Sequence, residues 1–388
     1  MKKVAFITPT YPVLSETFIQ TEVDALHACG HQVCVMTFEK EPSKIEFDYD
    51  VEEIGCALDW HVLSLFKVPN VIHAVSFVCS QSSLPKRSLL YYGAQLALQL
   101  SKQGVTHAHA HFCQHTTAHA IVASKLLGIG CSFVGHGHDV YESAFDIDQK
   151  LRFSDFSVAV CRDMYHDFQR TFPSNIKYLH CGVKLDQIPH LERKQSDGLH
   201  LVFVGRLVET KGVHFLLQAL AELLSAKRTR RTSIRLDIIG TGEQQSQLQQ
   251  LTKQLNLGDS VRFLGAKPHQ QVLEALQTYD CLVAPFCFSD SGCVDTGPLV
   301  LKEAMASGTP VITSNIMGCK EIVVPGTGYL VDEKDAGQLA QAIEQFSQLT
   351  SKQRTLMGRA ARQHVINNFD AFKQARCLSD WIEQVSSS

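Results

Sequence analysis

Short apolar runs alternate with stretches of helical spacing along most of the chain, a pattern typical of parallel sheets connected by helices. The runs that predict strands are Val4–Thr8, Gln32–Thr37, Cys131–Val134, Phe156–Val160 and Ile176–His180 in the first half, and Leu201–Val204, Leu236–Ile239, Val261–Leu264, Cys281–Ala284 and Pro310–Thr313 in the second. The segment between the two sets, from Lys184 to Leu199, is polar. It therefore predicts a linker between two α/β domains.

Composition agrees with two ordinary globular domains. A chain of 388 residues exceeds one typical core, and 45% hydrophobic with 19% charged residues is a common balance. The net charge of -3 disfavours a nucleic-acid partner. No signal peptide precedes the first strand, and no apolar run reaches the roughly eighteen residues that span a bilayer. We therefore expect a cytoplasmic protein, whose thirteen cysteines are reduced and mostly buried.

The most informative segment is DTGPLVLKEAMASG, which begins at Asp295. Its apolar spacing predicts a helix from Leu299, and Pro298 suits a helix start because it loses no intrahelical hydrogen bond there. A helix N-terminus entered through Gly297 is an anion site, and it would lie between the Asp295 and Glu303 carboxylates. A nucleotide sugar, with its diphosphate between a sugar and a ribose, fits this order. The alternative is that the Gly-Pro pair only marks the start of a surface helix and binds no ligand.

Two cations upstream favour the ligand-binding interpretation. Arg206 and Lys211 lie between the predicted strand Leu201–Val204 and a helix that starts near Gly212. Ligands of open α/β sheets bind at this end of a strand. A planar guanidinium and a compact ammonium together suit a diphosphate. Either cation alone would be a solvated loop residue by default, but their joint position favours phosphate binding.

These motifs resemble the retaining glycosyltransferases of family 4, also called glycosyl transferases group 1, which have the GT-B fold. The similar segments are VFVGRLVETKG, LDIIGTGE, VRFLGAKP and DTGPLVLKEAMASGTPVITS, in the order of that family. In the first half, ITPTYPVLSETFIQTEVDALHACGHQVCVMT and HAHFCQHTTAHAIVASKLLGIGCSFVGHGHDVY resemble the branch that builds bacterial exopolysaccharides and related surface glycans. The resemblance implies two Rossmann-like doubly wound domains facing across a cleft. We expect an acceptor domain at 1–185, a linker at 186–199, a donor domain at 200–365 and a helical segment at 366–388 that crosses back onto the first domain.

The resemblance also implies the reaction. A sugar would pass from a nucleoside diphosphate sugar (a UDP- or GDP-sugar) to a hydroxyl of a glycan or lipid-linked glycan, with retained configuration and without a cofactor or metal. The residues expected at the donor are Gly205, Arg206, Lys211, Gly265, Ala266, Lys267, Asp295, Gly297, Pro298, Leu299, Val300 and Glu303. The loop 265–267 would hold the base, Glu303 the ribose and Asp295 the sugar. Arg206, Lys211 and Asp295 would act in catalysis.

His136 is the catalytic candidate in the first half, because a family histidine at the matching strand end contacts the transferred sugar. The alternative is a strand-end histidine that is simply hydrogen-bonded in place. Six further histidines lie nearby, and His109 and His111 fall on one face of a strand. No close cysteine or carboxylate in the sequence completes a metal-ligand set, so no metal site is expected.

Acceptor contacts are expected from Ser15, Glu16, Thr17 and His111. For the loop of the first three residues a structural explanation is equally good, since Thr17 and Gln20 have capping-box spacing. The basic run 227–231 could contact an anionic membrane surface at its inner face. A solvated loop is favoured for it, because it lies between a predicted helix and a strand.

Three departures from the family pattern leave an alternative open. Asp295 replaces the usual first glutamate, the first loop lacks the common Gly-Gly pair, and Gly182-Val183-Lys184 replaces Gly-Val-Asp. The alternative is a catalytically inactive nucleotide-sugar-binding subunit of a glycan-assembly complex. A phosphorylase or hydrolase ranks lower because no lysine context suggests a pyridoxal cofactor. A dehydrogenase is disfavoured because TPTYPVLSETF after the first strand is not a glycine-rich phosphate turn.

Overall fold

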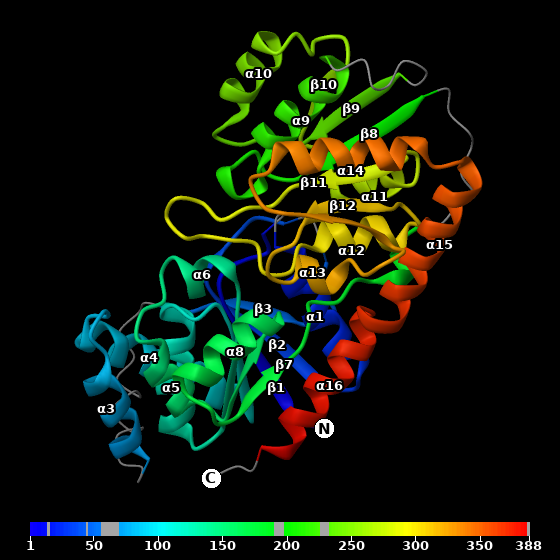
Figure 1. Cartoon of the computed structure of the whole chain (residues 1–388). Helices are drawn as coiled ribbons and strands as arrows, with labels where there is room; N and C mark the ends of the chain where they lie inside the picture. The colour runs from blue at the N-terminus through cyan, green and yellow to red at the C-terminus, as the bar shows by residue number, and fades with distance from the viewer. Residues whose placement is uncertain (14–15, 44–45, 56–69, 190–197, 226–232, 386–388) are drawn as a thin grey trace. The chain divides into compact units, whose positions relative to one another are not determined.

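A computed structural model describes residues 1–13, 16–43, 46–55, 70–189, 198–225 and 233–385. The chain divides into two compact units, one made of Met1–Gly182 with Ala371–Ser388 and the other of Val183–Asp370. The chain therefore passes from the first unit to the second after Gly182 and returns to the first after Asp370. The last helix belongs to the first unit (Figure 1).

The first unit is built on a parallel seven-stranded sheet in the order β3-β2-β1-β4-β5-β6-β7. Its strands are β1 (Lys3–Tyr11), β2 (Gln32–Lys40), β3 (Asp50–Glu53), β4 (His107–His111), β5 (Gly130–Gly135), β6 (Phe156–Ala159) and β7 (Ile176–Tyr178). The strand β1 is central, because Phe6 pairs with Val35 of β2 on one side and with His109 of β4 on the other. The apolar run of β1 is fully buried, as expected of a parallel sheet covered on both faces.

Helices cover this sheet in two groups (Figure 1). They are α1 (Thr17–Ala28), α3 (Val71–Ser80), α4 (Lys86–Lys102), α5 (His115–Leu127), α6 (Gly137–Tyr141), α7 (Ile147–Phe153), α8 (Arg162–Thr171) and α16 (Ala371–Gln384). The helix α1 packs against α16, whereas α3 and α4 pack against α5. The buried stripe of α1, formed by Ile19, Val23 and Leu26, has the spacing of one helix face.

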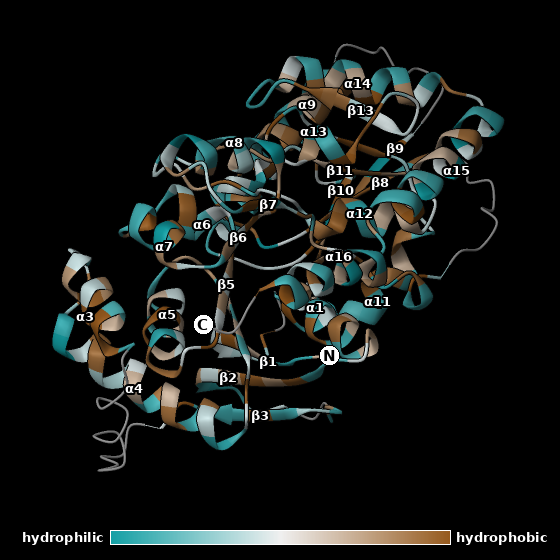
Figure 2. Cartoon of the chain, turned by 90° about the horizontal axis from the view of Figure 1, so that it is seen from below, coloured by the Kyte–Doolittle hydropathy of each residue, from teal (hydrophilic) through white to brown (hydrophobic). Residues whose placement is uncertain are grey.

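The second unit repeats the same plan with six parallel strands in the order β10-β9-β8-β11-β12-β13. The strands are β8 (Leu199–Val204), β9 (Ile234–Ile239), β10 (Val261–Gly265), β11 (Cys281–Ala284), β12 (Val311–Ser314) and β13 (Gly328–Val331). Its helices are α9 (Val213–Ser225), α10 (Gln245–Gln254), α11 (His269–Leu276), α12 (Leu299–Ala306), α13 (Cys319–Ile322), α14 (Ala336–Gln348) and α15 (Ser351–Asn368). Figure 2 shows the hydrophobic colour concentrated on the strands of this sheet.

The predicted fold class is confirmed, since both sheets are parallel and doubly wound in the Rossmann order. Each predicted strand is present within a few residues of its expected bounds. The prediction missed β3, whose largely exposed residues give no apolar run, and β13, whose four residues form only a short one. The helix predicted from Leu299 is α12, which starts after Pro298 and ends before Gly308 in a left-handed conformation.

One local prediction is wrong. The helix α1 starts at Thr17, its N-cap residue is Glu16, and no side chain caps it, so the capping box of Thr17 with Gln20 does not form. Ser15 and the basic run 227–231 lie outside the described residues, as do positions 190–197 of the expected linker. The cysteines of the described part are free thiols. Among the described helices, none is long and apolar enough to cross a membrane.

Candidate donor site and histidine cluster

Three of the expected donor residues follow the carboxyl ends of β8 and β11, where the strand order of the second sheet reverses. In open α/β sheets this switch point is the ligand site. Arg206 follows β8, Lys211 ends a short 3₁₀ turn (Glu209–Lys211), and Asp295 lies in the segment between β11 and α12.

Lys211 and Asp295 form an ion pair at this point. The Lys211 Nζ lies 2.9 Å from Oδ1 and 2.8 Å from Oδ2 of Asp295. The Lys211 side chain is 15% exposed, that of Asp295 27%, and the ammonium also lies 4.9 Å from the centre of the Phe286 ring. The lysine charge is therefore compensated when no ligand is bound, and a bound diphosphate would share it with Asp295.

The backbone fixes Lys211 in place through Gly212. This glycine has φ +62, and a Cβ there would lie 2.0 Å from the carbonyl oxygen of Pro285. On the same side, the N–H of Cys287 donates to the carbonyl of Thr210 at 3.0 Å. Only glycine permits this approach, which ties the lysine loop to the end of β11.

The start of α12 is held in a similar way. The N–H of Gly318 donates to the Thr296 carbonyl at 3.1 Å, and a Cβ on Gly318 would lie 2.2 Å from that oxygen. Gly297 and Pro298 follow directly and lead into the N–H groups of Leu299 and Val300 in the first turn. This eight-residue helix thus directs its positive end to the side of the sheet where Lys211 lies.

Two buried charges follow within α12, and one of them was missed from the sequence. Lys302 is fully buried, with its ammonium 5.3 Å from the centre of the Phe369 ring and 3.5 Å from the Gly297 carbonyl. Glu303 is 8% exposed. The burial of Lys302 was not predicted, because a lysine between apolar residues of LVLKEAMA is expected on the solvent-facing side of an amphipathic helix.

Glu303 has a partner that the sequence analysis also missed. Its Oε1 lies 2.7 Å from Nε2 of His269, the first residue of α11, whose side chain is 43% exposed. The hydrogen bond that His269 donates to the Glu303 carboxylate raises the pKa of His269. The sequence could have suggested His269 as a site residue, because it follows closely after the loop 265–267 that is expected to hold the nucleotide base. In that loop Gly265 has φ +71, and Ala266 and Lys267 are exposed.

Arg206 is the least constrained of the expected donor residues. It is exposed, and the described residues supply no hydrogen bond or ion pair to its guanidinium. Gly205 precedes it and donates its N–H to the Ile239 carbonyl at 3.0 Å, which holds the strand end next to β9. The place of Arg206 after β8 therefore agrees with the predicted phosphate contact, and its guanidinium is not engaged by another described residue.

In the first unit, His136 lies at the end of β5 and is the N-cap residue of α6. Asp139 fixes this turn, because its carboxylate accepts from the His136 N–H at 2.9 Å and from the Cys113 N–H at 2.6 Å. The His136 ring lies 4.5 Å from that of Phe18 and 4.9 Å from that of Phe112, measured between centres. Burial and the nearby His111 hold the pKa of His136 well below its ordinary value, so the imidazole is neutral.

Next to His136 the backbone is strained at Phe112, which has φ +71 directly after β4. A bulky residue seldom adopts this conformation without support. The support comes from two hydroxyls, since the Phe112 carbonyl accepts from Thr116 at 3.0 Å and from Thr117 at 2.6 Å. Strain that neighbouring groups enforce is typical of functional sites.

His111, an expected acceptor contact, lies next to His136. The residue is fully buried, its ring stacks on that of His136 at 5.5 Å, and its Nδ1 lies 3.3 Å from the His136 Nε2. Its contact with an acceptor stays a prediction, and in this structure His111 contacts His136. Glu16 and Thr17 begin α1 and remain acceptor candidates by position alone.

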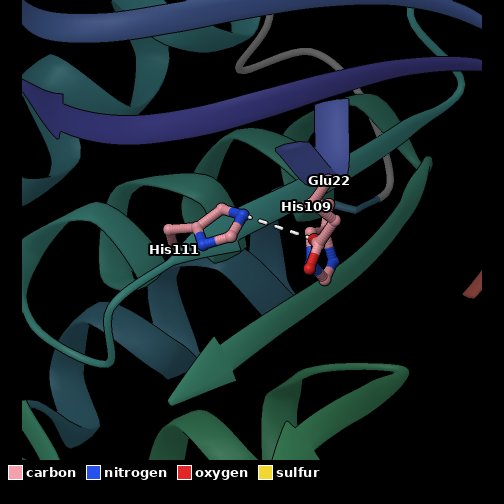
Figure 3. Close-up of side chains that lie close together, drawn as sticks. All are labelled: Glu22, His109 and His111. Atoms are coloured by element: carbon pink, nitrogen blue, oxygen red, sulfur yellow. Dashed lines mark ion pairs between the residues drawn. The ribbon is translucent and has the colours of Figure 1, made fainter. Parts of the chain in front are cut away.

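The strand β4, with the sequence HAHAH, brings a carboxylate to its histidines that the sequence analysis did not find. The Glu22 Oε1 lies 3.1 Å from Nε2 of His109 and 3.3 Å from Nε2 of His111 (Figure 3). The expectation that no carboxylate lies close to these histidines is therefore wrong. Burial raises the pKa of Glu22, but the facing His111 and His109 outweigh burial and hold this pKa below its usual range.

Comparisons with known proteins agree with this geometry. Residues 186–364 match the family model described as glycosyl transferases group 1. The chain is 25% identical to the putative colanic acid biosynthesis glycosyltransferase WcaL of Escherichia coli K12, over 95% of this chain and 96% of that protein. It is 28% identical to a glycogen synthase of Mycobacterium tuberculosis H37Rv, over 89% and 85%.

Among solved structures, a glycosyltransferase from Rickettsia africae superposes with a TM-score of 0.75 at 17% identity, covering 99% of this chain and all of that one. Anabaena Alr3699/HepE in complex with UDP-glucose superposes with a TM-score of 0.73 at 15% identity and the same 99% coverage. The architecture is therefore the GT-B fold. Residues 186–364 match the glycosyl transferases group 1, and the protein is a glycosyltransferase.

Proposed function

We propose that this protein transfers a sugar from a UDP- or GDP-sugar to a hydroxyl of a glycan or lipid-linked glycan, with retained configuration, in the assembly of a bacterial exopolysaccharide or surface glycan. The observation that carries the proposal is the Lys211–Asp295 pair beside the N-terminus of α12. The similarity to a protein named for colanic acid biosynthesis supports the product class. The neighbour solved with UDP-glucose supports the donor class.

In this proposal the second unit carries the leaving group. Departure of the sugar leaves a nucleoside diphosphate, whose growing negative charge must be compensated. Lys211, Arg206 and the first N–H groups of α12 supply positive charge at one strand edge, so no metal ion is needed on the diphosphate. Such preorganised donors stabilise the charge without reorganising during the reaction.

The two carboxylates have separate tasks in the proposal. Glu303 accepts hydrogen bonds from the ribose hydroxyls and is held by His269. Asp295 faces the sugar and also sets the position of Lys211. This double duty accounts for the shorter side chain at position 295, because a carboxylate that grips Lys211 at 2.8 Å does not need the extra methylene of a glutamate.

The first unit supplies His136 to the reacting sugar. Its neutral imidazole can accept or donate one hydrogen bond to a sugar hydroxyl, and Phe18 and Phe112 present apolar ring surface beside it. We extend the proposal to a cytoplasmic enzyme that reaches its lipid-linked acceptor at the inner membrane face.

The test is product formation. The protein is incubated with UDP- and GDP-hexoses and with lipid-linked glycans extracted from bacterial membranes, and the product anomer is read by NMR. Transfer with retained configuration, slowed roughly ten- to a hundredfold in Lys211→Ala, supports the proposal. An inverted product refutes the retaining mechanism. Nucleotide binding without transfer to any acceptor favours the inactive-subunit alternative.

A further inference from the structure

We infer that Glu22, His109 and His111 form a binding site for one divalent transition-metal ion, with Zn²⁺ as the ion that the donor set fits best. The site lies wholly within the first unit and uses none of the donor-binding residues of the second. Its test measures metal binding and does not depend on the proposed sugar transfer.

The secondary structure brings the three ligands together. Side chains two residues apart in a strand point to the same face, so β4 directs the imidazoles of His109 and His111 to one side. Glu22 reaches them from α1 (Figure 3). The three ligand atoms lie within 4.8 Å of one another. Two imidazoles and one carboxylate form a common ligand set for zinc, which leaves further positions for water.

The separations agree with metal coordination. The Glu22 Oε1 lies 3.1 Å from the His109 Nε2 and 3.3 Å from the His111 Nε2. Tetrahedral zinc has bonds of roughly 2.0–2.2 Å, which places neighbouring ligand atoms about 3.3–3.5 Å apart. The two separations from Glu22 are therefore within a few tenths of an ångström of those around a zinc ion, and the third ligand pair lies within 4.8 Å.

The three atoms have only one another as polar neighbours. Both Nε2 atoms and the Glu22 Oε1 are buried, and apart from their mutual contacts at 3.1 and 3.3 Å they have no hydrogen-bond partner among the described residues. Buried polar atoms without partners are rare, and an ion at their centre is one of the few explanations for three at one place.

The opposite sides of both rings are held as they are in metal sites. The His109 Nδ1 lies 2.8 Å from the Ser132 hydroxyl, and the His111 Nδ1 lies 3.3 Å from the His136 Nε2. Histidines that bind metals usually engage their second nitrogen in this way, which fixes the orientation of the ring. Here the partner of His111 is the candidate catalytic histidine, so the ion would position His136 through His111.

Space for a water ligand lies on the Glu22 side. The Glu22 side chain is 17% exposed, whereas both histidines are buried. A cavity of about 10 Å³ borders Glu22 and is also lined by Thr21 and His180. That volume holds roughly one water molecule.

The experiment measures the metal directly. The full-length protein is produced in zinc-supplemented medium, and its zinc, iron, nickel and manganese are quantified by mass spectrometry. The protein is then depleted with a chelator and titrated with Co²⁺, whose visible absorption reports coordination by nitrogen and oxygen. A thiolate charge-transfer band would reveal binding at one of the cysteines instead. The variants are Glu22→Gln and His109→Gln, with His119→Gln as the control, because His119 is a buried histidine of the same unit outside the cluster.

We expect one metal ion per chain in the wild type and in His119→Gln, with the ion and the cobalt spectrum lost in the two cluster variants. Iron in place of zinc, lost in the cluster variants, would support the site and identify iron as its metal. Wild-type protein that contains no metal and shows no cobalt spectrum would overturn the inference, and the cluster would then be a buried ion pair. An unchanged metal content in Glu22→Gln would also overturn it. If the variants do not fold, wild type decides alone: failure of Zn²⁺ to raise the Tm of the depleted protein also overturns it.

Discussion

Removing the Lys211 ammonium should slow sugar transfer strongly while hardly affecting the fold. A charge-assisted hydrogen bond contributes about 1.5–3 kcal/mol, and each 1.36 kcal/mol is tenfold in rate, so Lys211→Ala should lose roughly ten- to a hundredfold. The folding cost is much smaller. The ion pair with Asp295 is partly exposed and contributes about 1 kcal/mol or less.

The structure makes a sharper prediction for the partner, because Asp295 competes with phosphate for the same ammonium. Asp295→Asn should bind the free nucleoside diphosphate at least as tightly as the wild type. It should nevertheless transfer sugar more slowly, since the carboxylate that faces the sugar is gone. The two substitutions at one ion pair should therefore separate nucleotide binding from transfer.

The assay measures nucleotide release from the UDP- or GDP-sugar that the wild type turns over fastest, together with nucleotide affinity and Tm. Lys253→Ala is the matched control, since it removes an exposed lysine from α10 of the same unit. Wild-type transfer in Lys211→Ala would refute the donor-site assignment. If Asp295→Asn weakened nucleotide binding as much as Lys211→Ala does, Asp295 would act only by holding the lysine.

Three further results are expected. His269→Gln should lower the free energy of unfolding by about 0.2–1 kcal/mol in acid, because the bond to Glu303 raises the pKa of His269 above its unfolded value. That stabilisation is complete below the unfolded pKa and is lost as pH rises through the folded pKa, so equal differences at pH 5 and pH 9 in urea unfolding would contradict it. Gly318→Ala should cost about 1–3 kcal/mol and weaken nucleotide binding, since its Cβ would meet the Thr296 carbonyl at 2.2 Å; an unchanged Tm would contradict the backbone argument. Added Mg²⁺ should leave the transfer rate unchanged, and a strict requirement for it would show that the protein charges do not suffice for the diphosphate.

The fold could be predicted from the sequence because most strands of both sheets are short apolar runs, which differ in length and in the spacing of apolar residues from the helices between them. The strand β4 was visible only through its alternation of histidine with alanine, although all five residues are buried. The strand β3 was missed because its largely exposed residues give no apolar run. The strand β13 was missed because its four residues form only a short one.

The candidate donor site was predictable as a set of positions but not as a set of contacts. Lys211 and Asp295 are in contact, whereas the roles of Arg206 and Glu303 stay predictions. All four positions could be chosen because strand ends and a helix start are visible in the pattern. The pairing of Lys211 with Asp295 joins residues 84 positions apart, which no local spacing reveals. The approach of Glu22 to β4 was hidden for the same reason, because it depends on how α1 packs against the sheet.

The central claim is that the second unit binds a nucleoside diphosphate through Lys211. Calorimetric titration of the wild type and Lys211→Ala with UDP, GDP and ADP, without added divalent metal, tests it most directly. The account predicts that one of these nucleotides binds the wild type and that its affinity falls roughly ten- to a hundredfold in the variant. Absence of binding by all three, or equal binding by both proteins, would contradict it.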